Sequence, residues 1–146
     1  MVVRNTDHFR DCPAAFPELA DVLLKAGDTV FPAHSQILAM HSPFISQLLA
    51  ETGSYSVEQP VIIEAPLQQH KPETVKAWLM GVYGSGVLQF QSVQMAWQIC
   101  LLVDQLDCPS MLQQCGDYVS SNMEVAHPGT AREALEWIAL ADRLNF

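Results

Sequence analysis

Two histidines and an aspartate near the start of the chain are the first residues whose types suggest acid–base or metal chemistry. His34 and His41 lie seven residues apart, and Asp28 precedes them. Seven residues make two helical turns, about 10 Å of rise, so both rings would bind one ion only in a strained geometry. The spacing supplies no third ligand. We therefore expect a polar residue at a helix start and a surface histidine, with no metal site.

Two aspartates later in the chain are a second candidate for chemistry. Asp104 and Asp107 are close enough in sequence to act as a carboxylate pair in general acid–base catalysis. They end an apolar helical stretch, however, and Asp107 or Cys108 is expected to cap the helix that Pro109 opens. Three serines could be considered as nucleophiles, but none has a base at a recognisable spacing: Ser35, Ser46 and Ser85.

The four cysteines, Cys12, Cys100, Cys108 and Cys115, contain no CxxC pair and have no closing pair of histidines. A structural zinc site is therefore not expected. Three of them fall in apolar helical stretches, where a thiolate is disfavoured, and they are expected to be buried thiols. This use of cysteine favours a reducing intracellular setting, in the cytoplasm, the nucleus or both.

The only glycine cluster, GVYGSG at residues 81–86, matches neither a phosphate-binding loop nor a nucleophile elbow. It follows a helix, whereas a phosphate loop follows a strand, so we expect a helix end and a turn. No catalytic site and no cofactor emerge from the residues.

Composition narrows the class of partner. The 146 residues suit one domain, 49% of them are apolar, and only 16% are charged, with a net charge of −9. No basic residue lies between Lys76 and Arg132, so nucleic acid and anionic membranes are poor partners. The first ten residues have no signal-like apolar region, and no run is long enough to span a bilayer.

Periodicity predicts the elements that position these residues. Residues 21–31 alternate around Gly27-Asp28 and predict a β-hairpin. Short helices are expected at residues 34–41 and after Ser42-Pro43, then a loop at 53–59. Residues 61–63 predict a strand whose helical connection to the hairpin permits parallel pairing. A short strand at residues 87–90 is also considered.

Four helices should follow the strand. They are expected from Pro72, over residues 92–106, from Pro109, and from a capping box of Thr130 and Glu133. The last helix is apolar on two faces, and one neighbouring element cannot cover both. Something beyond this chain, or a second copy of it, is therefore expected to cover the rest.

Residues 21–49, DVLLKAGDTVFPAHSQILAMHSPFISQLL, closely resemble the opening of a BTB (POZ) domain. The matching pieces are the first Asp and Gly, Phe-Pro-Ala-His, Ile-Leu-Ala and Ser-Pro-Phe. The resemblance continues to residue 123, and residues 132–146 look like the first helix of a BACK or three-box extension. It implies an α+β fold with a small, mostly three-stranded sheet flanked and capped by helices. The domain would span 21–123, after an arm at 1–20 and before a linker and truncated extension at 124–146.

Members of this family are not enzymes, and the resemblance implies a protein–protein interaction module. It implies a homodimer and a substrate adaptor that joins an unknown client protein to a cullin-RING ubiquitin ligase. Two alternatives are a scaffold domain without cullin binding and a domain that recruits a corepressor. The implied dimer contacts are Phe9, Phe16, Ile37, Leu38, Met40 and His41.

The resemblance also implies a cullin-binding face, made of Leu48, Leu49, Gly53, Ser54, Tyr55 and Tyr83. Cullin-binding members often carry a hydrophobic residue, a spacer and Glu in the loop after the Ser-Pro helix, and Gly53-Ser54-Tyr55 departs from that motif. Ser35 likewise replaces an Arg that, in the transcription-factor branch, forms a charged pocket with the residue matching Asp21.

Overall fold

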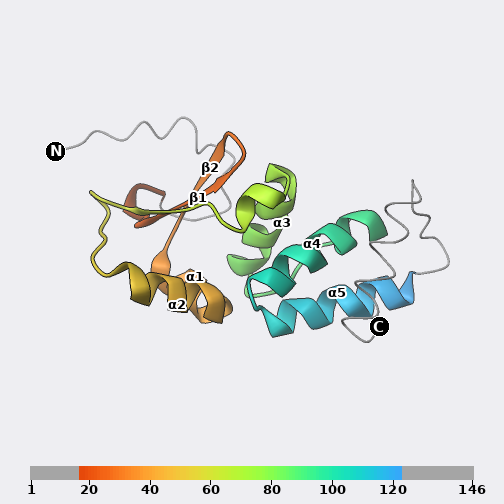
Figure 1. Cartoon of the computed structure of the whole chain (residues 1–146). Coiled ribbons are helices and arrows are strands. Elements are labelled where there is room, and N and C mark those ends of the chain that lie inside the picture. Colours follow the sequence, from red (N-terminus) through yellow and green to blue (C-terminus); the bar gives the residue numbers. More distant parts are fainter. Residues whose placement is uncertain (1–16, 123–146) are drawn as a thin grey trace.

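The computed structural model describes residues 17–122, which form a three-stranded sheet and five α-helices (Figure 1). The expected arm and the expected last helix lie almost wholly outside these residues. The elements are η2 (Pro17–Leu19), β1 (Val22–Ala26), β2 (Thr29–Ala33), α1 (Ser35–His41), α2 (Pro43–Thr52), β3 (Val61–Ile63), η3 (Leu67–Gln69), α3 (Pro72–Val82), α4 (Val93–Gln105) and α5 (Pro109–Ser121).

The sheet has the strand order β2-β1-β3, and it confirms both the hairpin and the parallel strand. Gly27 adopts φ 61° in the two-residue turn between β1 and β2, a conformation that glycine adopts without strain. β3 pairs with β1 in parallel, with Leu23 opposite Ile62. The alternate residues Val22 and Leu24 are fully buried, so this face of β1 belongs to the core.

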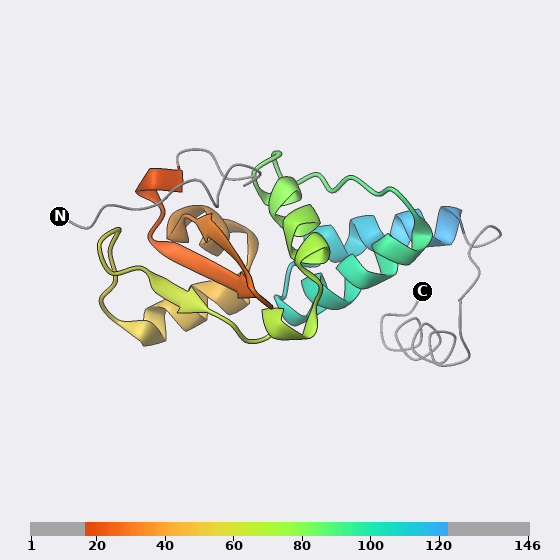
Figure 2. The same cartoon turned by 90° about the horizontal axis from the view of Figure 1, so that it is seen from above.

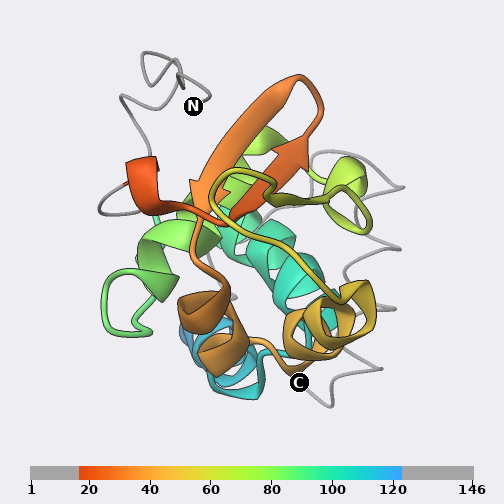
Figure 3. The ribbon, with the colours of Figure 1, turned by 90° about the vertical axis from the view of Figure 1, so that its left-hand side faces the viewer.

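α1 and α2 form a helical hairpin around Ser42. The Ser42 side chain accepts the Ile45 N–H as the N-cap of α2, and its own N–H closes α1 on the Leu38 carbonyl. Pro43 occupies the first helical position, where its missing N–H costs nothing, as the sequence predicts. In Figure 3 the sheet lies above this helical hairpin.

α4 and α5 form a second helical hairpin at the opposite end of the molecule. Figures 1 and 2 both show these two helices side by side, with α3 between them and the sheet. α3 begins at Pro72, as the sequence predicts, and it buries Val75, Trp78, Leu79 and Val82 along one face. One core therefore runs from the sheet through α3 into the second hairpin.

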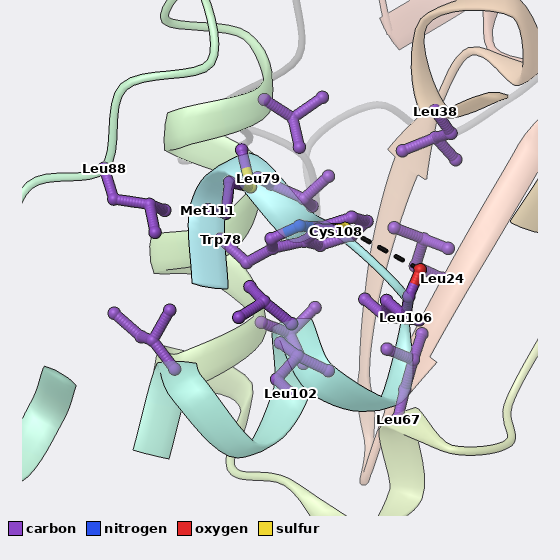
Figure 4. Close-up of a cluster of buried hydrophobic side chains, with 14 of the residues drawn as sticks. Leu24, Leu38, Leu67, Trp78, Leu79, Leu88, Leu102, Leu106, Cys108 and Met111 are labelled. Carbon is purple, nitrogen blue, oxygen red and sulfur yellow. Dashed lines mark hydrogen bonds between the residues drawn. The ribbon is translucent and has the colours of Figure 1, made fainter. Parts of the chain in front are cut away.

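The centre of that core is the Trp78 ring, which is fully buried among Leu24, Leu79, Leu102 and Leu106 (Figure 4). Cys108 lies beside the ring, and its thiol donates to the Leu106 carbonyl at 3.7 Å.

The short strand considered for residues 87–90 is not formed; this segment has no regular secondary structure. A strand needs a neighbouring strand to satisfy its backbone, and here a side chain of α5 takes that place, as described below.

Candidate interaction surfaces

The position of α1 is fixed at its first residue by Asp21. The Asp21 carboxylate accepts the Ser35 N–H at 2.8 Å and the Ser35 hydroxyl at 2.6 Å. A carboxylate at the first turn satisfies a free helical N–H and favours the helix dipole. Ser35 is thus itself the hydrogen-bond partner of Asp21.

A second contact ties the start of α1 to the end of α3. The Tyr83 hydroxyl accepts the backbone N–H of His34 at 3.0 Å and lies 2.8 Å from the Nδ1 atom of the same residue. The two rings meet edge to face, with centroids 5.8 Å apart. His34 is therefore a structural residue at the helix start, as the sequence predicts, and Tyr83 belongs beside α1.

The apolar residues of α1 divide between core and surface. Leu38 is fully buried within the chain, Ile37 is half-buried, and Met40 is 80% exposed. Ile37, Met40 and His41 share one face, since they stand three and four residues apart. Of the expected dimer contacts, the structure brings these three together and places Leu38 in the core; Phe9 and Phe16 lie outside the described residues.

The turn after α3 comes close to this face at His41. Gly86 adopts φ 81°, and a Cβ added there would lie 3.3 Å from the His41 ring. The next residue, Val87, is 54% exposed. We call the set Ile37, Met40, His41 and Val87 the α1 surface.

The segment that carries Val87 is held rigidly from α5. The Gln114 amide donates to the Gly86 carbonyl at 2.7 Å, and its oxygen accepts the Leu88 N–H at 2.8 Å. Leu88 packs where a side chain on Gly81 would be, and the Phe90 ring stacks on Tyr118 at 4.7 Å. Sequence reasoning missed Gln114, because a glutamine in a helix gives no signal of its distant backbone partners.

A second apolar surface lies along α2. Phe44 is 38% exposed and Leu48, one turn later, is half-buried on the same side. Gly53 and Ser54 are exposed beyond the end of the helix, and half-buried Tyr55 packs against the core. We call Phe44, Leu48, Gly53, Ser54 and Tyr55 the α2 surface.

Two residues of the expected cullin-binding face lie elsewhere. Leu49 is buried in the core, because it points with Ile45 toward the interior side of α2. Tyr83 is engaged with His34, as described above. Phe44, which sequence reasoning did not include, takes an exposed place on this face.

The described cysteines are free thiols in the core. Burial raises the pKa of the Cys108 thiol from 9.0 to about 11; the neighbouring polar groups of Trp78 and Ser42 oppose the rise, and the Asp107 charge adds to it. The pKa of Cys115 is also raised, first by a hydrogen bond with Cys100 and then by burial. Of the two residues expected to cap α5, Cys108 occupies the N-cap position. Its side chain makes no capping hydrogen bond.

Within residues 17–122, no three histidine, cysteine, aspartate or glutamate side chains gather as a metal site would require. None of the helices in the same stretch is long and apolar enough to cross a bilayer. In this part of the chain, Met40 and Phe44 leave apolar surface in water on the α1–α2 hairpin, and exposed apolar surface of this kind is typical of a protein–protein interaction domain.

The chain belongs to the BTB/POZ domain family, whose model matches residues 13–123. BTB domains are interaction modules, and the α+β fold expected from the sequence is confirmed. The expected BACK or three-box extension lies outside this match.

Two solved structures show the same fold. The BTB domain of human Gigaxonin has a TM-score of 0.56 and 20% identity, over 81% of this chain and 96% of that one. The BTB domain of zebrafish PATZ1 has a TM-score of 0.55 and 19% identity, over 70% of this chain and 76% of that one. No curated protein matches the sequence.

Proposed function

We propose that the protein is a homodimeric interaction module and that two copies meet through the α1 surface. The observation that carries this proposal is the exposure of Met40, which leaves 80% of a large apolar side chain in water. The helix around it is anchored at both ends, by Asp21 and Tyr83 at its start and by Ser42 at its end.

A rigid apolar face of this kind suits a two-fold interface, in which the same patch of each copy contacts the other. Methionine adapts its shape to a partner, and burying one such side chain is worth about 1.5–3 kcal/mol. Val87 extends the patch across the Gly86 contact, and Gln114 holds it in place. The interface would therefore combine elements from both ends of the fold.

Sedimentation equilibrium tests the dimer. Met40→Asp should weaken the dimer by about 100-fold or more, because a charge would be buried in both copies. Ile62→Asp is the matched control, since Ile62 is also exposed but stands on β3. A wild-type chain that is monomeric at about 50 µM, or a Met40→Asp dimer of unchanged strength, would contradict the proposal.

We further propose a second role for the α2 surface, as the place where a cullin scaffold binds and the domain serves as a ligase adaptor. The exposed Phe44 ring beside Leu48 favours this role, because exposed aromatic side chains are common anchors of interfaces. Gly53-Ser54-Tyr55 stands in place of the hydrophobic-x-Glu motif, so Phe44 and Leu48 would supply the contact instead.

Co-purification with a cullin tests the second role. Phe44→Asp should abolish cullin binding and leave the dimer intact, whereas Met40→Asp should do the reverse. Leu49→Asp is unsuitable, because Leu49 is buried and its replacement would unfold the domain. If the wild-type chain binds no cullin at tens of micromolar, the domain is an oligomerisation scaffold alone.

A further inference from the structure

β3 is an edge strand with a regular pattern of main-chain groups on its outer side. The strand order β2-β1-β3 places it at one end of the sheet, so within residues 17–122 only β1 pairs with it. At the opposite edge Pro32 removes a donor from β2, whereas β3 itself contains no proline. The β3 edge is therefore the one that keeps its full capacity to pair with another strand.

The ladder to β1 fixes which groups lie on that outer side. The Val61 N–H donates to the Asp21 carbonyl at 3.1 Å, so this N–H points toward β1. The C=O and N–H of one trans peptide point in opposite directions, and the pattern repeats at every second residue of a strand. The outward groups are therefore the Pro60 carbonyl, the Ile62 N–H and carbonyl, and the Glu64 N–H. Within residues 17–122, none of them makes a hydrogen bond.

This pattern is complementary to itself. In an antiparallel pair centred on Ile62, each Ile62 N–H meets the Ile62 carbonyl of the other copy, and each Glu64 N–H meets the Pro60 carbonyl. The next bond of such a ladder would join a Pro60 N–H to a Glu64 carbonyl. Proline has no N–H, and the Glu64 carbonyl already accepts the Gln68 N–H at 2.9 Å. Every outward group is then paired, whereas a shift by two residues would leave half of them without a partner.

The side chains suit the same arrangement. Ile62 is 58% exposed, and the two isoleucines would cover each other across the two-fold axis. The Glu64 carboxylate lies 3.7 Å from the Lys25 ammonium, and it would stand opposite the uncharged Pro60 of the other copy. No like charges oppose each other between the paired segments 60–64.

We propose that a second copy of this chain pairs with β3 along its outer edge, antiparallel and centred on Ile62, so that the two sheets become one. This contact is separate from the α1 surface and does not depend on the dimer proposed there. Its area is well below the standard size of a protein interface, so we expect a Kd of about 1 mM. Where both contacts form, each chain has two different two-fold partners, and dimers link into longer assemblies at high concentration.

Sedimentation in a Met40→Asp background tests this contact alone, because the α1 surface is then disabled. Between about 50 µM and about 1 mM the weight-average mass should rise about 1.5-fold, as a Kd of about 1 mM requires. Ile62→Pro removes the outward N–H without touching the ladder to β1, and it should keep the chain monomeric. Ile62→Val retains that N–H and is the matched control. Ile62→Lys places like charges opposite each other and should act as the proline does, also if the proline disturbs the strand.

Amide hydrogen exchange measured by NMR locates the contact. The Ile62 and Glu64 N–H groups should exchange about two-fold more slowly at about 1 mM than at about 50 µM, whereas the Val61 N–H, which is already bonded, should not change.

Three results would overturn the inference. The first is a chain that stays monomeric at about 1 mM, and the second is association that Ile62→Pro and Ile62→Lys leave unchanged. The third is protection of the Ile62 and Glu64 amides that does not depend on concentration, since the edge would then be covered by its own chain. Failure of the α1 dimer leaves each of these measurements unaffected.

Discussion

The Ser42 hydroxyl donates to the carbonyl of Leu106, sixty-four residues away, at the point where α4 ends. The same oxygen accepts the Ile45 N–H and so caps α2. One buried side chain therefore joins the first helical hairpin, which carries Met40 and Phe44, to the second hairpin.

The first prediction concerns this junction. Ser42→Ala removes the cap of α2 and leaves the buried Leu106 carbonyl without its donor, so we expect a loss of about 2–4 kcal/mol in the free energy of unfolding. Urea denaturation measures the loss. Ser46→Ala, at an exposed position of the same helix, should change stability by less than about 0.5 kcal/mol. Equal effects of the two substitutions would show that the junction carries no special stability.

The second prediction concerns the support of Val87. Gln114→Ala should destabilise the domain by about 1–3 kcal/mol, because two hydrogen bonds to the 86–88 backbone are lost. It should also weaken the proposed dimer, since Val87 loses its fixed position. Gln113→Ala removes only an exposed bond to Asp117 and should cost about 0.5 kcal/mol or less. Denaturation and sedimentation of both variants provide the comparison.

The third prediction concerns alkaline pH. The pKa of Cys108 rises from 9.0 to about 11 on folding, so the native state keeps a proton that the unfolded chain loses. Its contribution is fully present below pH 9 and is lost progressively as the pH rises to about 11, by about 2–3 kcal/mol in total. Urea denaturation between about pH 8 and pH 10.5 should show a shallower decline for Cys108→Ala. An identical decline in both proteins would exclude this role for Cys108.

The fourth prediction tests the direction in which β3 faces. Ile63 is buried and Ile62 is exposed, although the two are chemically identical neighbours. Ile63→Ala should cost about 2–5 kcal/mol, and Ile62→Ala less than about 1 kcal/mol. Thermal or urea unfolding distinguishes them. The reverse order would mean that the strand pairs with β1 in a register shifted by one residue.

The sequence was informative wherever local chemistry decides structure. The alternation of residues 22–26 and the Gly27 turn predicted the first two strands, and Ser42-Pro43 predicted the start of α2, because turns and caps depend on neighbouring residues. The family signature, which is a set of such local features at fixed spacing, predicted the BTB fold.

Local reasoning failed where a partner lies far away in the chain. Residues 87–90 have the composition of a strand, but Gln114 from α5 binds the Gly86 carbonyl and the Leu88 N–H, and only the packed fold brings them together. Tyr83 was placed on the α2 side by analogy, whereas its hydroxyl binds His34, forty-nine residues away.

The sequence by itself determined the elements of this protein, its class of fold and the apolar character of α1 and α2. Only the tertiary structure decided which apolar residues stay in water. Leu38, Leu49, Met40 and Phe44 lie on two short helices with similar patterns, and the packing of the folded chain buries the first two and exposes the others. Helical periodicity gives the angle between side chains, but the side of the helix that faces the core depends on what packs against it.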